Sequence, residues 1–313
     1  MVKNIIATTT INPPTKALIK YSQLSEWHVI VAGDLKTPHD LFSSLDNVTY
    51  LSPDDQVKRS KRLSDLIGWK CIQRRNFAVL EAFLQGADNI AVIDDDNVPF
   101  DDWGKDLLLG KKSEVNFYET NQPVFDPIGA TNYPKLWHRG FPLQLVPDRD
   151  YSKISKRTVT PSIQANFWNG EPDVDAVCRM IYRPNCTFED RFFPISSNAM
   201  TPVNSQNTVI SRSVINDYFL FPGIGRMDDI WASYYAQAKG HKVVFTKPSV
   251  LSDRSLGTDG RYPCEEDMRR EYIGYEYSLA LIRDLQKDPE SIVKYLPVKS
   301  WEAYQEFKAL TKE

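Results

Sequence analysis

Three adjacent aspartates, Asp94, Asp95 and Asp96, directly follow an apolar run at residues 90–93. Adjacent carboxylates repel one another, and a buried carboxylate without a partner is costly. A cluster of this kind at the end of a strand therefore favours a compensating cation. Mg²⁺ and Mn²⁺ prefer oxygen ligands and bridge protein carboxylates to phosphates. The alternative interpretation is a helix cap or a solvated turn, but the apolar strand before the cluster favours a metal–diphosphate site.

A second acidic pair, Asp228 and Asp229, precedes the apolar residues 230–232. Acidic residues are favoured in the first turn of a helix, so capping is the simplest explanation for either one alone. Two in succession, after a Gly-Arg dipeptide and before a tryptophan, favour a catalytic or acceptor-hydroxyl role for one of them.

Other polar residues have types suited to binding phosphates and hydroxyl groups. Arg74 and Arg75 stand at the start of a predicted helix, where arginine side chains and the helix N-terminus both attract phosphate oxygens. A solvated helix end is the alternative, and it applies to Arg74 more than to Arg75. Asn204, Gln206 and Asn207 are neutral donors and acceptors that suit sugar hydroxyls, or alternatively a hydrogen-bonded turn.

The first hundred residues alternate strand-like and helix-like segments. Strands are predicted at residues 2–8, 28–32, 48–51 and 90–93, and helices at 15–24 and 75–85. This alternation predicts an α/β fold with a mostly parallel sheet and helices on both faces. Ligands bind at the carboxyl ends of the strands in such sheets. The polar residues 8–10, 33–34 and 94–96 should therefore converge.

The rest of the chain differs in composition and has less regular hydrophobic periodicity. Residues 100–205 are rich in Pro, Asn, Tyr and Trp and indicate long loops with short strands. Helices are predicted at 209–219, 228–238, 265–286 and 300–310, and a strand at 242–246. Since there is no internal repeat and no flexible linker, we expect one domain over residues 1–260. A C-terminal helical extension, residues 261–313, should pack on it.

Composition narrows the class of protein. The chain has 313 residues, of which 42% are hydrophobic and 25% charged, as is usual for a globular protein. Its net charge of −3 provides no sequence-wide basic field, so a nucleic acid is not indicated, although a local patch leaves it open as an acceptor. No apolar run approaches the ~20 residues of a membrane helix. The four cysteines form no C-x-x-C pair, so a structural zinc site is not indicated. We expect a cytoplasmic protein without a membrane partner.

Several motifs resemble those of known families. Residues 94–97, Asp-Asp-Asp-Asn after an apolar strand, resemble the D-x-D motif of GT-A glycosyltransferases. Three segments resemble motifs of the plant reversibly glycosylated polypeptides, which are UDP-arabinopyranose mutases: WHRGFPL at 137–143, NGEPDVDA at 169–176 and GRMDDIWA at 225–232. Three others are more similar to the STELLO glycosyltransferase-like family: TTTINPPT at 8–15, GDLKTP at 33–38 and NSQNT at 204–208.

The resemblance implies a GT-A-like, Rossmann-like catalytic domain that binds a nucleotide-sugar and uses Mn²⁺ or Mg²⁺. Together with the residue types, it assigns nucleotide-sugar binding to Thr8, Thr9, Thr10, Asp34, Arg75, Asp94, Asp95, Asn204, Gln206 and Asn207. It assigns the metal to Asp94 and Asp96. A third ligand is Asp253, which stands where the mutases have the histidine of a W-H-S-K motif. The catalytic candidates are Arg139, Asp228 and Asp229.

Three functions are compatible with these motifs. The favoured one is a retaining glycosyltransferase that moves a sugar from a UDP-sugar to an acceptor, because the segments 8–15 and 204–208 match its family better. The alternative is a UDP-arabinopyranose mutase or self-glycosylating protein that acts through Arg139, which matches the arginine that takes the glycosyl group in that family. Arg139 is equally well suited to clamp a diphosphate. A non-catalytic scaffold is the third. The sugar, the acceptor and the formation of a homo-oligomer are not determined by the sequence.

Overall fold

The computed structural model describes residues 3–252 and 265–312. The first part alternates strands and helices, as the sequence predicts. The strands are β1 (Asn4–Thr10), β2 (Trp27–Gly33), β3 (Val48–Leu51) and β4 (Asn89–Ile93). The helices are α1 (Lys16–Ser22), α2 (Pro53–Arg59), α3 (Lys61–Ile67) and α4 (Arg75–Leu84). Strand β1 is parallel to both β2 and β4, and β2 is parallel to β3.

Helices cover both faces of this parallel part of the sheet. The chain moves from β1 through β2 to β3 in one direction and then returns past β1 to β4. Because crossover connections between parallel strands are right-handed, this reversal places α1 and α4 on opposite faces. Both helices contact the strands and bury apolar side chains, among them Leu18 of α1 and Phe77 of α4. The predicted α/β fold class is confirmed.

Helices α2 and α3 lie in a polar segment for which no helix was predicted. The Ser52 hydroxyl accepts a hydrogen bond from the Asp55 backbone N–H, and the Asp55 carboxylate accepts one from the Ser52 backbone N–H. This capping box, with a proline at the first helical position, is a recognised start signal for a helix. The two helices enclose Arg74, whose guanidinium donates to Gln56 at 2.8 Å and to Ser64 at 3.1 Å. Arg74 is therefore a buried structural residue and not a solvated helix end.

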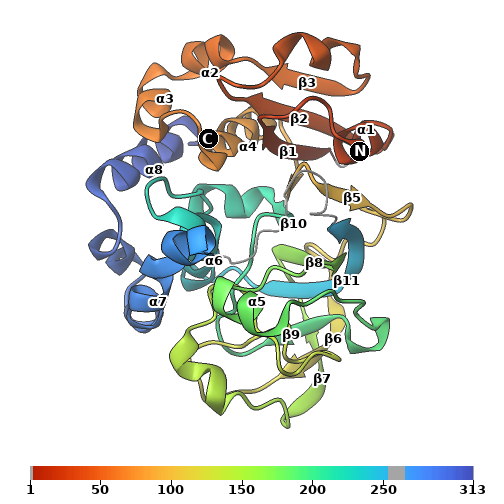
Figure 1. Cartoon of the computed structure of the whole chain (residues 1–313), viewed down its shortest axis with the longest axis vertical. Coiled ribbons are helices and arrows are strands. Elements are labelled where there is room, and N and C mark those ends of the chain that lie inside the picture. The colour runs from red at the N-terminus through yellow and green to blue at the C-terminus, as the bar shows by residue number, and fades with distance from the viewer. Residues whose placement is uncertain (1–2, 253–264, 313) are drawn as a thin grey trace.

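The remaining strands extend the sheet. They are β5 (Asn97–Pro99), β6 (Ser113–Tyr118), β7 (Ile154–Val159), β8 (Ile163–Gly170), β9 (Ile195–Ser197), β10 (Asn207–Ser211) and β11 (Val243–Ser252). The strand order is β3-β2-β1-β4-β10-β8-β11-β9-β6-β7, and β5 pairs with β11. Figure 1 shows β1, β2 and β3 at one end of the molecule and β6, β7 and β9 at the other. One sheet thus runs through the described part of the chain.

The predicted helix at residues 209–219 is wrong. Val209 and Ile210 lie in β10, which is antiparallel to both of its neighbours, β4 and β8, and both side chains are fully buried. A short 3₁₀ helix, Arg212–Asp217, follows the strand. Strands buried on both faces are apolar without alternation, so periodicity alone does not distinguish them from a buried helix.

The C-terminal helices lie along one side of the molecule (Figure 1). Helices α5 (Ala176–Tyr182), α6 (Asp228–Ala238), α7 (Glu265–Leu285) and α8 (Val298–Leu310) complete the fold. Helix α8 packs on α3, and α7 packs on the turn Gly225–Met227. A Cβ atom at Gly225 would lie 2.0 Å from the Arg270 carbonyl oxygen, so only glycine allows α7 to approach this closely. None of the described helices combines the length and the apolar character needed to cross a membrane.

Candidate active site

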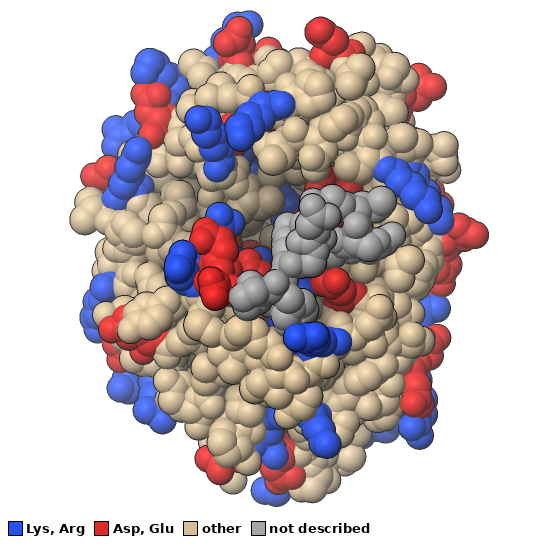
Figure 2. Space-filling view, in the orientation of Figure 1, with Lys and Arg blue, Asp and Glu red and all other residues tan. Residues whose placement is uncertain are grey.

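A cavity of about 470 Å³ opens beside the carboxyl end of β4. Residues of several sequence motifs line this cavity. They come from the acidic turn, the central loops and the start of α6, and are Asp94, Arg139, Asp173, Gln206, Asp228 and Asp229. Figure 2 shows that this face of the molecule is hollowed near its middle and that acidic and basic side chains gather around the hollow. The fold therefore brings Asp94 and Asp229, which are 135 positions apart in the sequence, to the same cavity.

The other predicted site residues within the described chain are not part of the cavity lining. They are Thr8, Thr9, Thr10, Asp34, Arg75, Asp95, Asp96, Asn204 and Asn207. Thr8 and Thr9 join strands, because their hydroxyls donate to the carbonyl oxygens of Ile93 at 2.8 Å and Ala32 at 2.6 Å. Both polar atoms of the Asn207 side chain have partners: its oxygen accepts a hydrogen bond from the Trp103 indole N–H, and its nitrogen donates to the Phe167 carbonyl oxygen. Binding roles for these residues stay predictions.

The three polar strand ends do converge. The Thr10 hydroxyl donates to the Asp95 carboxylate, and the Asn12 amide donates to the same oxygen at 3.1 Å. These contacts join the end of β1 to the acidic turn after β4. Asp34, after β2, is almost fully buried and accepts from the backbone N–H groups of Leu35 at 2.6 Å and Cys71 at 3.1 Å. Its carboxylate thereby anchors the segment that leads into α4.

Arg75 fixes the acidic turn to the loop before β10. Its guanidinium is buried at the start of α4 and donates to Asp94 Oδ1 at 2.5 Å. The same guanidinium donates to the backbone oxygen of Ser205 at 2.8 Å and to the Ser205 hydroxyl at 2.7 Å. Asp94 itself is about a quarter exposed and lines the cavity. Arg75 therefore orients Asp94 from behind.

The donor set around the acidic turn consists of oxygen atoms. Asp94 and Asp96 are half-buried, whereas Asp253, the predicted third ligand, lies outside the described residues. Asn97 Oδ1 and Ser252 Oγ are buried and find no hydrogen-bond partner within the described residues, and these two residues pair across β5 and β11. Oxygen-only donors fit a hard divalent cation. Within the described ranges no group of three or more His, Cys, Asp or Glu side chains is arranged to hold a metal.

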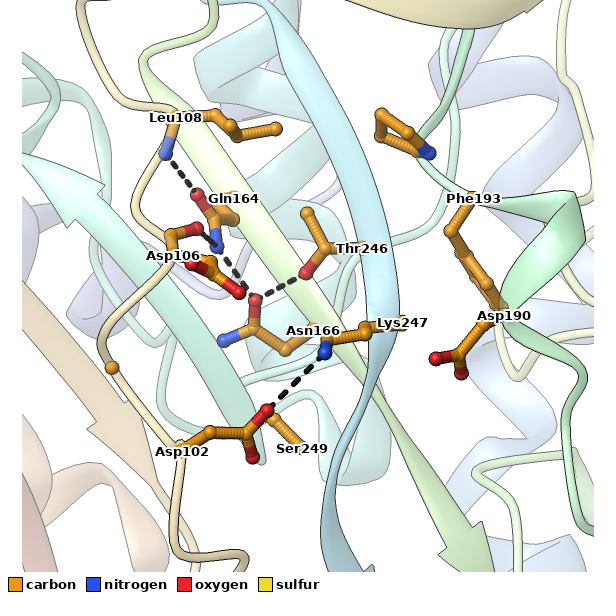
Figure 3. A pocket seen from close by; sticks show the side chains of 12 residues that line it. Asp102, Asp106, Leu108, Gln164, Asn166, Asp190, Phe193, Thr246, Lys247 and Ser249 are labelled. Atoms are coloured by element: carbon orange, nitrogen blue, oxygen red, sulfur yellow. Dashed lines mark hydrogen bonds and ion pairs between the residues drawn. The ribbon is translucent and has the colours of Figure 1, made fainter.

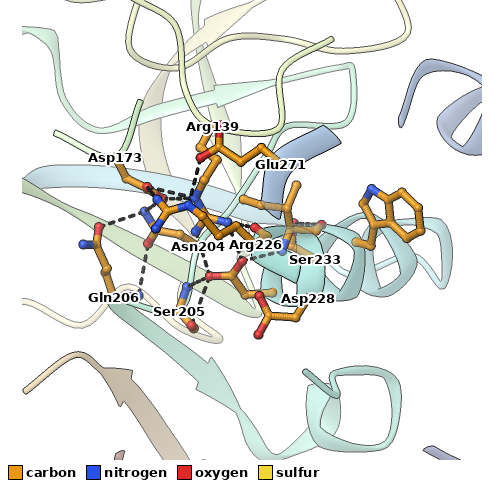
Figure 4. A network of polar contacts seen from close by, with 12 residues as sticks. Arg139, Asp173, Asn204, Ser205, Gln206, Arg226, Asp228, Ser233 and Glu271 are labelled. Atoms are coloured by element: carbon orange, nitrogen blue, oxygen red, sulfur yellow. Dashed lines mark hydrogen bonds and ion pairs between the residues drawn. The ribbon is translucent and has the colours of Figure 1, made fainter. Parts of the chain in front are cut away.

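Arg139 is held between two carboxylates. Its Nε donates to both oxygens of Asp173, at 2.9 and 3.0 Å. Its Nη1 and Nη2 donate to the two oxygens of Asp229, at 2.9 and 3.0 Å, and Nη1 also donates to the Arg226 carbonyl oxygen. All three side chains are at least nine-tenths buried. Figure 4 shows how Arg139, Asp173 and Arg226 cluster beside the start of α6.

The two adjacent carboxylates at the start of α6 have different environments. Asp229 also accepts from the backbone N–H groups of Ser205 at 2.9 Å and Ile230 at 2.8 Å. Burial acts to raise the pKa of Asp229, but Arg139 outweighs it and lowers that pKa below its ordinary value. Asp228 accepts from the Gln73 amide at 2.7 Å. Burial, and then the charge of Asp229, raise the pKa of Asp228 to about 7. Carboxylates whose pKa values are pushed apart are a signature of acid–base sites.

Glu271 was not predicted from the sequence, although it supports this network from α7. It is fully buried and accepts from Arg226 Nε at 2.8 Å and from the Ala176 backbone N–H at 2.7 Å. The Tyr275 hydroxyl donates to it at 2.6 Å. The sequence did contain a clue to its role. Glu271 falls on the apolar face of an amphipathic helix, and an ionised side chain buried there needs hydrogen-bond or ion-pair partners.

A second cavity, of about 220 Å³, lies between β8, β11 and the loop near residue 106 (Figure 3). None of the predicted site residues lines it. Several of its polar groups are bonded to one another: Asn166 accepts from Gln164 at 2.8 Å, and Lys247 pairs with Asp102 at 3.2 Å. The cavity beside β4, which several of the predicted residues line, is therefore the candidate active site.

Comparison with known proteins gives matches only among solved structures. No protein-family model matches the chain, and no curated protein matches it. A glucosyl-3-phosphoglycerate synthase from Mycobacterium tuberculosis, in complex with Mn²⁺, UDP and phosphoglyceric acid, is 12% identical with a TM-score of 0.40, over 86% of this chain and 78% of that one. A mannosyltransferase from Pyrobaculum calidifontis, in complex with GDP-Man and Mn²⁺, is 10% identical with a TM-score of 0.39, over 99% and 85% of the two chains. Likenesses this distant carry no argument about the reaction of this chain.

Proposed function

We propose that this chain is a metal-dependent glycosyltransferase that uses a UDP-sugar donor in the cavity beside Asp94. One observation carries the proposal: Asp94 of the acidic turn after β4 and Asp228, whose pKa is raised, line the same cavity. Glycosyl transfer needs a site for a diphosphate at one end and a group that handles a proton at the other. Asp94 and Asp228 are our candidates for the two ends, and the cavity volume of about 470 Å³ falls in the range of small-ligand sites.

At the donor end, Asp94 and Asp96 would hold Mn²⁺ or Mg²⁺, with Asp253 as a further ligand. When bound, the metal stabilises negative charge on the departing diphosphate as a Lewis acid. Arg75 supports this role indirectly, because it orients the Asp94 carboxylate. We assign the nucleoside to the neighbouring strand ends around Thr10 and Asp34, as the resemblance to the STELLO family implies.

At the acceptor end, Asp228 would take the proton from an acceptor hydroxyl. The bond between the anomeric carbon and the diphosphate oxygen breaks, and the acceptor oxygen forms the new bond to that carbon. The electron pair of the broken bond leaves with the diphosphate, and Asp228 returns its proton to solvent. A group whose pKa lies near the working pH is suited to this task, and the pKa of Asp228 is raised to about 7. Retention of the anomeric configuration stays part of the proposal on the strength of the resemblance.

Arg139 would act as a fixed positive charge beside the sugar and diphosphate. The alternative function, a mutase that acts through Arg139, requires a neutral guanidine nitrogen as the nucleophile. Burial acts to lower the pKa of Arg139, but Asp173 and Asp229 together raise it well above its usual value. Four of its hydrogen bonds also go to these two carboxylates. Both features favour the fixed charge.

The test is to incubate the purified protein with Mn²⁺ and a panel of UDP-sugars, without acceptor, and to analyse the products by chromatography and intact mass. Release of UDP with neither a ring isomer nor a protein adduct supports the transferase. An isomerised UDP-pentose, or a sugar-sized adduct on Arg139, would replace it with the mutase. If no UDP-sugar is bound or turned over, the scaffold function is favoured and the proposal fails.

A further inference from the structure

The Gln206 side chain in the cavity wall has a fixed orientation. The indole N–H of Trp168 donates to Gln206 Oε1 at 2.6 Å, and the Asn204 amide donates to the same oxygen at 3.3 Å. An indole nitrogen only donates, so the group that faces it is the carbonyl oxygen of the amide. The Gln206 amide nitrogen must then point the other way, and Figure 4 shows it directed away from Arg139 and Asp173.

This nitrogen is an unsatisfied donor. Gln206 lines the cavity and is 3% exposed, and its Nε2 has no hydrogen-bond partner among the described residues. A buried donor without a partner is costly, so a native structure retains one where something else supplies the acceptor. Gln206 is among the residues that line the cavity, so we take a ligand bound there as the source of the acceptor.

The position of Gln206 indicates which part of a ligand supplies the acceptor. Its backbone oxygen accepts from the Asp94 backbone N–H at 3.0 Å, which ties it to the diphosphate end of the site. Its side chain is linked through Asn204 to Asp173, and Asp173 contacts Arg139, whose other partner is Asp229 beside the acceptor-end residue Asp228. A group next to Gln206 therefore lies between the diphosphate and the acceptor. In a nucleotide-sugar that group is the sugar ring.

We propose that Gln206 is the residue that selects the donor sugar, by donating a hydrogen bond from Nε2 to a sugar oxygen. The inference rests on the proposed function and deepens it. Trp168 is a positioning residue, because its indole N–H prevents the Gln206 amide from rotating so that its oxygen, instead of its nitrogen, faces the sugar. The selected sugars carry an oxygen acceptor at that position, and sugars without one are bound less well.

The experiment measures equilibrium binding in Mn²⁺ of UDP and of five probes: UDP-glucose, UDP-galactose, UDP-N-acetylglucosamine, UDP-xylose and UDP-arabinopyranose. The ratio of the UDP dissociation constant to that of each UDP-sugar isolates the contribution of the sugar. In Gln206→Leu we expect the ratio for the preferred sugar to fall about tenfold, the effect of one hydrogen bond to an uncharged ligand group, while UDP binding stays within about twofold. Gln206→Glu keeps an oxygen for Trp168 but removes the donor, so the ratio should fall as far.

Trp168→Phe separates positioning from packing. It retains the aromatic ring and the Gln206 donor but releases the amide, so we expect a smaller fall in the ratio, of about threefold, and a weaker preference among the five sugars. Thermal unfolding of each variant checks that the fold is kept. Unchanged ratios for all five sugars in both Gln206 variants would overturn the inference. Failure of the wild-type protein to bind UDP at all would instead overturn the proposed function.

Discussion

Arg139 and Asp229 form a buried bidentate ion pair in the wall of the cavity, with N–O distances of 2.9 and 3.0 Å. This pair assigns different roles to the two adjacent aspartates of α6. Asp229 is committed to Arg139 and to backbone donors, whereas Asp228 accepts a hydrogen bond from Gln73 and faces the cavity. The expected consequences for activity and stability differ accordingly.

Replacing Asp228 and Asp229 by asparagine, one at a time, should separate chemistry from structure. Asp228→Asn removes the proton acceptor but keeps the shape, so turnover should fall by about 10²–10⁴-fold with little change in the melting temperature. Asp229→Asn removes one of the two carboxylates that hold the buried Arg139 guanidinium, and should cost up to about 3–5 kcal/mol of stability. UDP release and thermal unfolding measure the two effects. Equal and minor losses in both variants would mean that the pair only caps the helix.

The pH dependence of turnover should report the ionisation of Asp228. Its pKa is raised to about 7 in the folded protein, from an ordinary value near ~4, and it must be ionised to accept a proton. We expect kcat/KM to rise with pH through about 7, and this limb to be absent in Asp228→Asn. Asp175, whose pKa burial also raises to about 7, caps α5 outside the cavity. Asp175→Asn is therefore a control that should keep the limb.

The same raised pKa predicts the sign of a stability change. Between pH ~4 and about 7 the folded state holds a proton on Asp228 that the unfolded state has released. Stability from this group is therefore fully present below pH ~4 and is lost as the pH rises through about 7. Denaturant unfolding across this range should show a shallower decline in Asp228→Asn than in the wild type. An identical decline in both would contradict the assignment.

Removal of a metal ligand should abolish turnover without unfolding the protein. Asp96 lies half-buried in the turn after β4, so Asp96→Ala should keep a melting temperature close to that of the wild type. Metal-dependent turnover of UDP-sugars should be lost, because the charge on the leaving diphosphate is no longer neutralised. Turnover that persists in excess EDTA, in either protein, would exclude the metal role.

A matched pair of glycine variants tests whether α7 supports the site. Gly225 and Gly86 both have a positive φ, of 61° and 78°, so alanine should cost each about 1–2 kcal/mol from the backbone. Only at Gly225 does the new Cβ meet α7, at the Arg270 carbonyl oxygen; at Gly86 nothing lies within 4 Å. Gly225→Ala should therefore displace Arg226 and lower turnover, while Gly86→Ala keeps it. Equal turnover in the two variants would show that the contact with α7 is dispensable.

The sequence predicted the framework of the site because that framework depends on local patterns. Helix α6 matches its predicted bounds, and the polar ends of β1, β2 and β4 converge as parallel-sheet geometry requires. The residues that line the cavity could not be told from those behind it, because that depends on which way each side chain points. Thr8 and Thr9, for example, have the composition of a binding loop but use their hydroxyls to join strands.

Side-chain hydrogen bonds between residues far apart in the sequence could not be predicted from local patterns either. Glu271 meets Arg226 across 45 positions, and the Gln206 amide takes its orientation from Trp168 across 38. Neither pairing leaves a local signature. Strand β10 was missed for a related reason, since a central strand is recognised by its neighbours in the sheet and not by its own periodicity.

The metal–diphosphate site is tested most directly by calorimetric titration of UDP into the protein, once in Mn²⁺ and once in EDTA. We expect saturable binding of one UDP per chain in Mn²⁺, weakened at least about tenfold in EDTA and in Asp94→Asn. The absence of UDP binding in Mn²⁺, or binding of the same strength in EDTA, would contradict a metal–diphosphate site at the end of β4.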